Sequence, residues 1–421
     1  PDQMGVYASS AMAQLDDNGF GGLLGARANG GRVSSKQLAL GLADMPADFV
    51  SAYVLGNVGT SGPSLGACAT FFYNLRQAVN DIRNGLTKVA VVGVAESGID
   101  PRIIDGYYTM GALASDAELL KLDAEKGLTE PDHRRASRPF SSNCGFTISE
   151  STQFIVLFDD ELALQLGAQI HGSVPDVFIN ADGYKKSISS PGIGNYLTVA
   201  KAVAAGAGII GDKAIKTRSF VQSHGTSTPQ NRVTESHILN ETAKTFGIEN
   251  WPVAAIKAYI GHSIGAASGD QLIASLGVWN DNILPGIATI DHIADDVHQS
   301  NLRLQKEHME VEAGSLDVAI LNAKGFGGNN ASVTLLSPLL SEKMLKGRHG
   351  EKAWQAYLAR REQVQAAAAA YDDAACETGL SVHYQFGENV LDGEDLEISR
   401  DGIAIKGWAS KVALDFDSPY A

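Results

Sequence analysis

Residues 66–95 read GACATFFYNLRQAVNDIRNGLTKVAVVGVA, and this stretch decides the fold class. Apolar side chains recur every three or four positions through 69–84, which predicts an amphipathic helix. Residues 88–95 are apolar on both faces, as expected of a strand that helices cover on each side. A helix followed directly by such a strand is typical of a layered α/β fold.

The same alternation of strands and helices continues along the chain. A strand leading into a turn is expected at 4–10, and further buried strands are expected at 154–158, 177–180, 220–222, 318–322 and 331–335. Helices are expected at 161–166, 199–207, 234–246 and 269–279. The whole pattern predicts an α/β architecture of several layers.

The segment after Pro338 differs in composition from what precedes it. Residues 341–371 are charged and alanine-rich, and they predict a long, mostly solvated helix or helix pair. Residues 382–386 and 403–408 alternate in the manner of strands, with Asp-Gly turns between them. We interpret residues 339–421 as an appended segment outside the catalytic unit, helical first and then β.

Composition limits the possible partners. A chain of 421 residues that is 44% hydrophobic can bury a large core, and its length suits two or three domain-sized units. Its net charge of −15 argues against nucleic acid as the main partner, because phosphate binding favours a basic surface. Three widely spaced cysteines suggest neither a disulfide framework nor a zinc site, and they fit a reducing, cytoplasmic compartment. The apolar runs are too short to span a bilayer, so no membrane association is expected.

Cys68 is a candidate nucleophile. It lies one residue before the expected helix, where unpaired backbone N–H groups can lower the pKa of a thiol. Gly62 and Gly66 favour a sharp turn that would expose the sulfur. A buried structural cysteine is the commoner role for a single residue of this type, and the local sequence leaves both roles open.

Two histidines occupy glycine-containing turns further along the chain. His224 lies in His-Gly-Thr-Ser-Thr-Pro after an expected strand, where Thr226 and Thr228 could bond the amides of an extended ligand. A turn capped by hydroxyl side chains would explain this motif equally well. His262 follows Gly261, and Lys257 lies five residues before it. A single histidine in such a turn is more often structural.

Residues 322–330, Asn-Ala-Lys-Gly-Phe-Gly-Gly-Asn-Asn, form a glycine-rich turn. Its backbone N–H groups could supply half of an oxyanion hole, and the amide of Cys68 could supply the other half. Glycine-rich turns more often bind phosphate, but no Gly-Lys-Ser/Thr follows, which excludes a P-loop.

Together these segments resemble the β-ketoacyl synthases, the condensing enzymes of fatty-acid and polyketide synthesis, which belong to the thiolase superfamily. The resemblance covers about residues 5–336 and rests on four motifs in the family's order: Ala-Cys-Ala, His-Gly-Thr-Ser-Thr-Pro, Lys-x4-His and Gly-Phe-Gly-Gly-x-Asn. It implies a thiolase-like αβαβα fold of two related halves. Residues 1–165 would carry the nucleophile, residues 166–338 the two histidines, and residues 339–421 would form a C-terminal extension.

The resemblance also implies a mechanism. Cys68 would accept a primer acyl group as a thioester. His224 and His262 would bind the carbonyl of a malonyl thioester and stabilise the enolate that forms as CO2 leaves, with Lys257 supporting His262. The amides of Cys68 and Phe326 would hold the tetrahedral oxyanion, and the Phe326 ring would act as a gate beside the nucleophile.

Substrate contacts and partners follow from the same resemblance. Thr226 and Thr228 match positions that contact the phosphopantetheine arm, and Ser187 stands where the family usually has threonine. Ala67 and residues 106–112 would help to line the acyl pocket. No metal is expected, and no cofactor beyond the phosphopantetheine that substrates carry. The implied partners are an acyl carrier protein, acyl-CoA and malonyl thioester substrates, and a second copy of the chain in a homodimer.

The chain departs from the family pattern at several positions. Gln271, beside Asp270, replaces the acidic residue usually found nine positions after the second histidine. Arg232 stands where an aspartate is expected, and Lys324 replaces an aromatic residue at the glycine-rich turn. Residues 149–152 differ from the usual Gly-Glu-Gly-Ala. These changes indicate a divergent branch with a rearranged set of supporting contacts.

Other functions are weaker matches. A thiolase would need a second cysteine in a late Cys-x-Gly turn, and Gly325–Gly327 contains none. A non-catalytic partner of a ketosynthase, resembling a chain-length factor, would usually lack the nucleophile, which is retained here. Docking of an acidic carrier protein would need a basic patch, for which the candidates are Arg134, Arg135, Lys185 and Lys186.

Family members carry a further N-terminal region, and the extended bacterial type, which starts fatty-acid synthesis from acetyl-CoA, is the variant that this chain resembles. We therefore predict that the native protein contains additional residues before residue 1. Residues 1–421 expressed alone should not form a stable, active unit, because a sheet without its neighbouring strands exposes unpaired backbone groups. Soluble, active expression of residues 1–421 alone would contradict this prediction.

Overall fold

The computed structural model describes residues 2–13, 15–16, 19–20, 22–188, 190–379 and 384–416. Within it, helix α4 (Thr70–Arg83) leads into strand β4 (Val89–Glu96), which confirms the prediction made from residues 66–95. Phe72 and Leu75 of α4 are fully buried. They pack in the same core as the side chains on one face of β4, so the helix and the strand stabilise one another.

Strand β4 is central to the N-terminal sheet. It pairs in parallel with β1 (Met4–Ser9) and antiparallel with β5 (Ser151–Phe158). The side chains of β1 alternate between the two faces of the sheet. Tyr7 joins the core shared with α4, whereas Val6 packs on the opposite face against α3 (Met45–Phe49).

The C-terminal sheet has six strands among the described residues, in the order β10-β8-β7-β12-β13-β6. Its central strand β12 is parallel to β7 and antiparallel to β13. The bounds are β6 (Ser173–Asn180), β7 (Ser219–Gln222), β8 (Trp251–Ala254), β10 (Leu302–Arg303), β12 (Val318–Gly325) and β13 (Asn329–Leu336). These strands include the four that the sequence predicted in this part of the chain.

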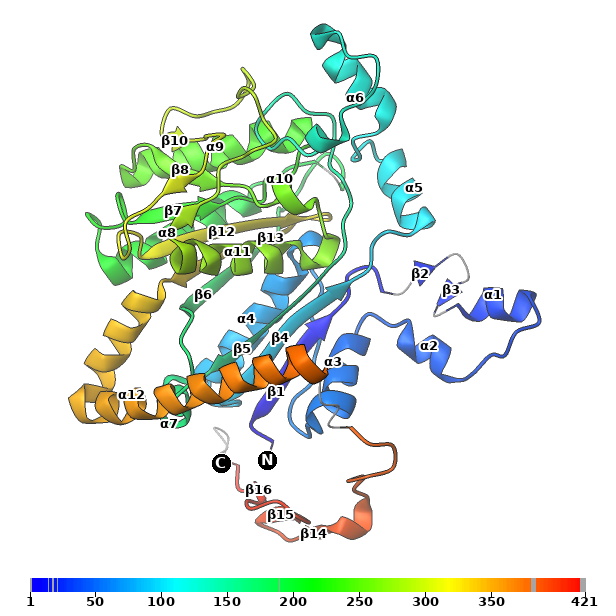
Figure 1. Cartoon of the computed structure of the whole chain (residues 1–421), viewed down its shortest axis with the longest axis vertical. Coiled ribbons are helices and arrows are strands. Elements are labelled where there is room, and N and C mark those ends of the chain that lie inside the picture. Colours follow the sequence, from blue (N-terminus) through cyan, green and yellow to red (C-terminus); the bar gives the residue numbers. More distant parts are fainter. Residues whose placement is uncertain are drawn as a thin grey trace.

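Two helices fill the space between the sheets. Helix α11 (Ala267–Asp281) lies beside α4, and both share a core with inward side chains of the two sheets. Helices α8 (Gly194–Ile210) and α9 (Pro229–Phe246) cover the outer face of the C-terminal sheet. With α3 on the outer face of the N-terminal sheet, the layers run helix, sheet, helix, sheet, helix (Figure 1). The predicted αβαβα layering is confirmed.

Strand β12 illustrates how the sequence produces this layering. Ala319 and Leu321 face the central helices, whereas Val318 and Ile320 face α8 and α9. All four side chains are fully buried. A strand covered on both faces has no place for a polar side chain along this run, which explains its continuous apolar sequence.

The remaining elements lie around these layers. The short helices are α1 (Leu23–Ala28), α2 (Lys36–Leu40), α5 (Pro101–Thr109), α6 (Asp116–Asp123), α7 (Asp160–Leu166) and α10 (Lys257–Ile260). The short strands are β2 (Leu15–Asp16), β3 (Gly19–Phe20), β9 (Ile283–Leu284) and β11 (Met309–Glu310). Within the part of the chain that is described, no helix combines the length and the apolar character that a membrane span requires.

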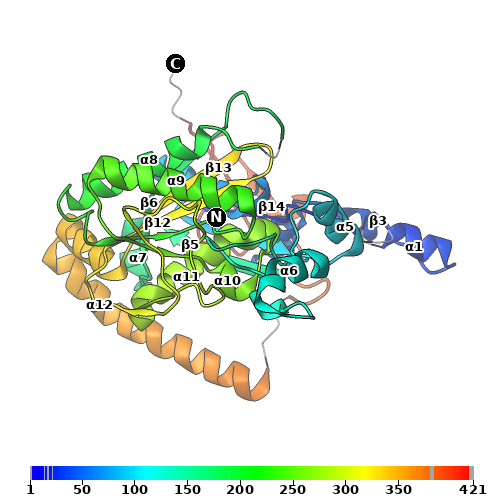
Figure 2. The same cartoon turned by 90° about the horizontal axis from the view of Figure 1, so that it is seen from above.

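The predicted C-terminal helix pair is confirmed. Helix α12 (Pro338–Thr378) is interrupted at Gly350, whose backbone has φ 80° and ψ 168°. Both views show it along the outer side of the molecule (Figures 1 and 2). Trp354 and Tyr357 are buried against Leu164 of α7, and the Tyr357 hydroxyl donates to the Ala168 carbonyl at 3.0 Å. The helix is therefore attached to the layered body by a small core of its own.

The strand predictions after α12 are partly wrong. Residues 380–383 lie outside the described residues, and Tyr384–Phe386 form no strand. The predicted strand at 403–408 is present as β15 (Gly402–Ile405), which pairs with β14 (Leu396–Ile398) and β16 (Val412–Ala413). An alternating pattern forms a strand only where a neighbouring strand can accept its hydrogen bonds, and no strand among the described residues pairs with Tyr384–Phe386.

We predict that the small core under α12 contributes to stability. Replacing buried Trp354 by alanine should lower the free energy of unfolding by about 3–5 kcal/mol, because the change leaves a cavity. Tyr371 lies on the same helix and is 50% exposed, so Tyr371→Ala should change stability by no more than about 0.5 kcal/mol. Denaturant unfolding of both variants measures the difference. Equal effects would show that α12 does not pack in this way.

Candidate active site

A tight turn before α4 positions Cys68. The turn Ala67–Ala69 is a single 3-10 turn, and Ala67 has φ 49°, a conformation that non-glycine residues rarely adopt. The hydroxyl of Thr70 closes the turn, because it accepts from the Gly66 amide at 3.0 Å and donates to the Ala67 carbonyl at 2.6 Å. Cys68 is therefore held at the very start of α4, as the sequence predicted.

The thiol is more buried than the sequence suggested. Cys68 is 3% exposed, and burial raises the pKa of its thiol to about 12, although the nearby Lys257 ammonium acts in the opposite direction. The expected lowering of the pKa by the helix N-terminus is outweighed, because desolvation penalises a thiolate more strongly than the helix stabilises it. The cysteine is a neutral thiol until a ligand or a base changes its surroundings.

His224 is fixed through its backbone. It follows β7, and the next residue, Gly225, has φ 54°. The amides of His224 and Gly225 both donate to the carboxylate of Glu235, at 2.7 and 2.8 Å. On the other side, the Lys257 ammonium donates to the His224 carbonyl at 2.5 Å. The peptide units on both sides of His224 are thus held by charged groups, which leaves only the ring free to meet a ligand.

His262 is held by a short bridge to the segment 147–149. Its amide donates to the Thr147 carbonyl at 2.8 Å, and its carbonyl accepts from the Ser149 amide at 3.0 Å. Its Nδ1 accepts from the Ile264 amide at 3.1 Å. Because Nδ1 is an acceptor, the neutral ring carries its proton on Nε2. His262 therefore presents an N–H donor.

The two rings face the same space. Their centroids lie 5.8 Å apart and their planes are at 89°. Burial lowers the pKa of both His224 and His262 well below 6.5, and the charge of Lys257 lowers both further. Both imidazoles are therefore neutral at neutral pH. Two neutral donors separated in this way can hold one carbonyl oxygen between them.

Lys257 acts on both histidines from within the protein. It is 2% exposed, and burial lowers its pKa to about 8. Its direct contact is the carbonyl of His224, while its effect on His262 is electrostatic. Support of His262 by Lys257 therefore stays a prediction.

The glycine-rich turn lies against the nucleophile. A side chain at Gly325 would meet the Gly66 carbonyl at 2.2 Å and the Cys68 amide nitrogen at 3.1 Å, so only glycine permits this approach. Phe326 follows Gly325, and its carbonyl accepts from Asn329 at 2.6 Å. The backbone after β12 is thereby brought next to the Cys68 amide.

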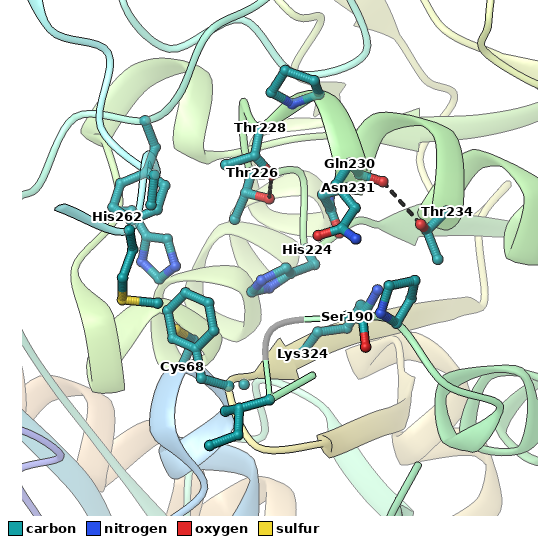
Figure 3. Close-up of a pocket in the computed structure, with 18 of the residues that line it drawn as sticks. Cys68, Ser190, His224, Thr226, Thr228, Gln230, Asn231, Thr234, His262 and Lys324 are labelled. Atoms are coloured by element: carbon teal, nitrogen blue, oxygen red, sulfur yellow. Dashed lines mark hydrogen bonds between the residues drawn. The ribbon is translucent and has the colours of Figure 1, made fainter. Parts of the chain in front are cut away.

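One cavity, of about 440 Å³, connects the predicted site residues. It is lined by Cys68, His224, His262, Thr226, Thr228 and Phe326, together with residues that the sequence did not single out, including Asp182 and Ser190. Figure 3 shows His224 between Cys68 and the two threonines. Ser187 does not line this cavity; it is exposed and exchanges hydrogen bonds with Ser190, which does line it.

A second cavity, of about 370 Å³, begins at Phe326. It is mainly apolar, and Ile103, Gly106, Tyr107 and Met110 of the α5 region line it. The Phe326 ring lies 5.8 Å from the ring of Tyr107. Phe326 therefore stands between the two cavities, which agrees with the expected position of a gate, and part of the segment 106–112 lines the second cavity.

Sequence reasoning missed two buried carboxylates. Glu235 accepts not only from His224 and Gly225 but also from Asn231 and Asn322. Glu96 accepts from the amides of residues 11, 12 and 265 and from the Ser10 hydroxyl. Glu235 lies four residues after Asn231 on α9, hence on the same helix face, but this spacing alone does not distinguish a buried glutamate from a solvated one.

The residues that depart from the family pattern form their own hydrogen bonds and ion pairs. The Gln271 amide nitrogen donates to the carbonyls of residues 222, 223 and 322, a task that a carboxylate could not perform. Asp270 accepts from Ser263 and Ser151 instead. Arg232 forms a two-pronged ion pair with Asp296, at 2.8 and 2.9 Å.

Among the described residues, no group of three or more His, Cys, Asp or Glu side chains is arranged to hold an ion. The groups that the structure brings together in the site include a thiol, two neutral imidazoles, backbone amides and two lysines.

The chain is similar in sequence to two protein-family models and to known enzymes. Residues 1–163 match the family model described as "Beta-ketoacyl synthase, N-terminal domain", and residues 171–291 match "Beta-ketoacyl synthase, C-terminal domain". The chain is 52% identical, over all 421 residues, to Beta-ketoacyl-[acyl-carrier-protein] synthase FabY of Pseudomonas aeruginosa, of which it covers 66%. It is 26% identical over 296 residues, 69% of this chain and 65% of the relative, to 3-oxoacyl-[acyl-carrier-protein] synthase 2 of Synechocystis.

A solved structure gives the same result. The crystal structure of the ketosynthase FabY from P. aeruginosa superposes with a TM-score of 0.95 and 53% identity, covering 100% of this chain and 65% of that one. The chain thus spans about two thirds of the length of these relatives. On the two matched domains and on this likeness, the chain belongs to the β-ketoacyl synthase family.

Proposed function

We propose that the chain catalyses the decarboxylative condensation of a malonyl thioester with an acyl group carried on Cys68, as a 3-oxoacyl-[acyl-carrier-protein] synthase. The observation that supports this most directly is the convergence of one thiol and two neutral imidazoles on a single buried cavity. A hydrolase would need only one histidine and access for water. Two neutral donors beside a thiol suit the stabilisation of an enolate.

The first step would load the primer. The sulfur of Cys68 attacks the carbonyl carbon of an acyl thioester, the bond from that carbon to the leaving sulfur breaks, and the thiol proton ends on the released carrier thiol. Because burial raises the pKa of Cys68, this proton must pass to a base as the sulfur attacks. A neutral imidazole, whose nitrogen can accept a proton, is available in His224.

The second step would generate the nucleophile. The carbonyl oxygen of a malonyl thioester lies between His224 and His262, the bond to its carboxylate breaks, and CO2 departs. The electron pair from that bond moves into the enolate, whose negative oxygen receives two N–H donors. Donors fixed before the reaction stabilise this charge without reorganisation, which is the largest contribution that such a site can make.

The third step would form the new carbon–carbon bond. The enolate carbon attacks the acyl carbon on Cys68, and the tetrahedral oxyanion lies near the amides of Cys68 and Phe326. Collapse of this intermediate releases the sulfur of Cys68, which regains a proton, and the β-ketoacyl product stays on its carrier. The close approach of Gly325 to the Cys68 amide supports this pairing of donors.

Substrate class and partners are part of the proposal. An arm of phosphopantetheine would pass Thr226 and Thr228, whose hydroxyls lie 3.4 Å apart at the wall of the cavity. The second cavity, which Ile103 and Tyr107 help to line, would receive the acyl chain of the primer, and we propose a short primer such as acetyl from acetyl-CoA. An acyl carrier protein would deliver the malonyl group. Arg134, which is largely exposed and pairs with its neighbour Asp132, is the candidate for docking, whereas Arg135 is engaged with Asp123 and Asp291.

We further propose a homodimer in a cytoplasmic compartment. Tyr53, Val54, Leu55, Val58 and Leu65 are all at least 40% exposed and precede the nucleophile in sequence. An exposed apolar run of this kind is favourable only if another surface covers it. Fatty-acid synthesis is the pathway in which such a condensing enzyme is expected to act.

The nucleophile can be tested by intact mass. Incubation of the natural full-length protein with acetyl-CoA should add the mass of one acyl group, and Cys68→Ala should abolish the gain. Cys144→Ala is the matched control and should retain it, since Cys144 lines neither cavity. Loading from acyl carrier protein alone would exclude CoA as the donor. No adduct from either donor would favour a non-catalytic partner of a ketosynthase.

The lowered pKa values of His224 and His262 predict how the rate of the proposed decarboxylation depends on pH. Because their pKa values lie well below 6.5, both rings stay neutral as the pH falls from 8 to 6, and the rate of CO2 release from malonyl thioester should show no histidine titration in this range. Lys257→Met removes a charge that lowers both pKa values, so the acid limb should move to higher pH whatever the absolute rate. An acid limb near pH 6.5 in the unmodified protein would contradict this assignment.

A further inference from the structure

The side chain of Lys324 lines the active-site cavity, and no step of the proposed reaction uses its amine. It lies on β12, two residues after Asn322 and hence on the same face of the strand. Its side chain lines the 440 Å³ cavity together with His224, and its charge is close enough to lower the pKa of His224. In Figure 3 it lies on the side of His224 that faces Ser190, with Cys68 and His262 on the other side.

The Lys324 ammonium has no direct acceptor among the residues that the structure describes. The nearby carboxylate of Glu235 already accepts four hydrogen bonds. Asp182 accepts from Gly194 and Asn330 and is paired with Lys185. Both carboxylates attract Lys324 only at a distance, and burial lowers its pKa from the usual value.

An unpaired cation in a partly buried position is unfavourable unless a ligand supplies the missing charge. The ligand must enter the cavity beside His224 and must bring an anionic group of small size. Of the two substrate classes in the proposed reaction, only the extender has such a group close to its reacting carbonyl. In a malonyl thioester, one methylene separates the carboxylate from the carbonyl that the histidines would hold.

We propose that Lys324 binds the carboxylate of the extender thioester, and that this contact selects a carboxylated thioester over an uncharged acyl thioester on the His224 side of the cavity. This inference rests on the proposed function. A primer that entered the same place would leave the ammonium without a partner, and it would therefore be rejected. Lys324 is in this respect a specificity-determining residue.

The contact has a defined kinetic consequence. The carboxylate is anionic in the ground state, but its charge moves into the enolate as the carbon–carbon bond breaks and neutral CO2 leaves. An ion pair with Lys324 therefore strengthens binding of the malonyl group and weakens during the chemical step. Such an interaction lowers KM without raising kcat. Removal of the charge should raise KM for malonyl thioester strongly and leave kcat unchanged or higher.

The test uses the natural full-length protein and analogues of CoA in which an amide replaces the thioester, so that decarboxylation cannot occur. The probes are the malonyl amide and its uncharged methyl ester, with affinities measured by calorimetry. The unmodified protein should bind the malonyl amide about 10- to 100-fold more tightly than the ester, the range expected of a charge-assisted hydrogen bond. Lys324→Met should bring this ratio close to one, and Lys324→Arg should restore most of it.

Two results would overturn the inference. One is a ratio near one in the unmodified protein. The other is an affinity ratio that Lys324→Met leaves unchanged. If that unchanged ratio came with equally weaker binding of both probes, Lys324 would be assigned to the arm that the two probes share. Acetyl loading of Cys68, measured on each variant, reports the fold and the nucleophile separately. Absence of an adduct on the unmodified protein from either acetyl-CoA or an acylated carrier protein would instead contradict the proposed function itself.

Discussion

The active site depends on the hydrogen bonds that the carboxylate of Glu235 accepts. It is fully buried and accepts hydrogen bonds from the His224 and Gly225 amides and from the side chains of Asn231 and Asn322. A buried carboxylate is tolerated only when donors surround it in this way. The four donors come from the turn after β7, from α9 and from β12. The position of His224 and the position of the hairpin formed by β12 and β13 are therefore determined together.

The charged side chains near the two histidines determine the electrostatic character of the cavity. Lys257 and Lys324 place two amines near the histidines, while Gln271 contributes no charge and spends its amide on three backbone carbonyls. Positive charge and desolvation both favour neutral imidazoles. In the reaction that we propose, both imidazoles would therefore be neutral hydrogen-bond donors at neutral pH, and no separate acid would be needed to hold the developing negative charge.

The sequence predicted those parts of the molecule that a repeated pattern or an ordered motif specifies. Helix α4 and strand β4 follow from the apolar pattern, and the helix pair of α12 follows from its charged, alanine-rich composition. Cys68, His224 and His262 are identified by the ordered motifs that resemble the family, since their turns alone leave their roles open. Glu235 could not be recognised in this way, because a glutamate on a helix is usually solvated and its burial depends on strands far away in sequence. The alternating run at Tyr384–Phe386 failed as a strand for a related reason, since hydrogen-bonding partners are supplied by the fold and not by the segment.

The close approach of Gly325 to the Cys68 turn has a consequence for biosynthesis. The ribosome completes the N-terminal half, with its cysteine, well before it makes the hairpin of β12 and β13. Until that hairpin docks, the thiol has neither its cavity nor its second oxyanion donor. The pocket in which we propose that acyl transfer occurs can therefore form only after both halves of the chain have been made, although its nucleophile belongs to the first half.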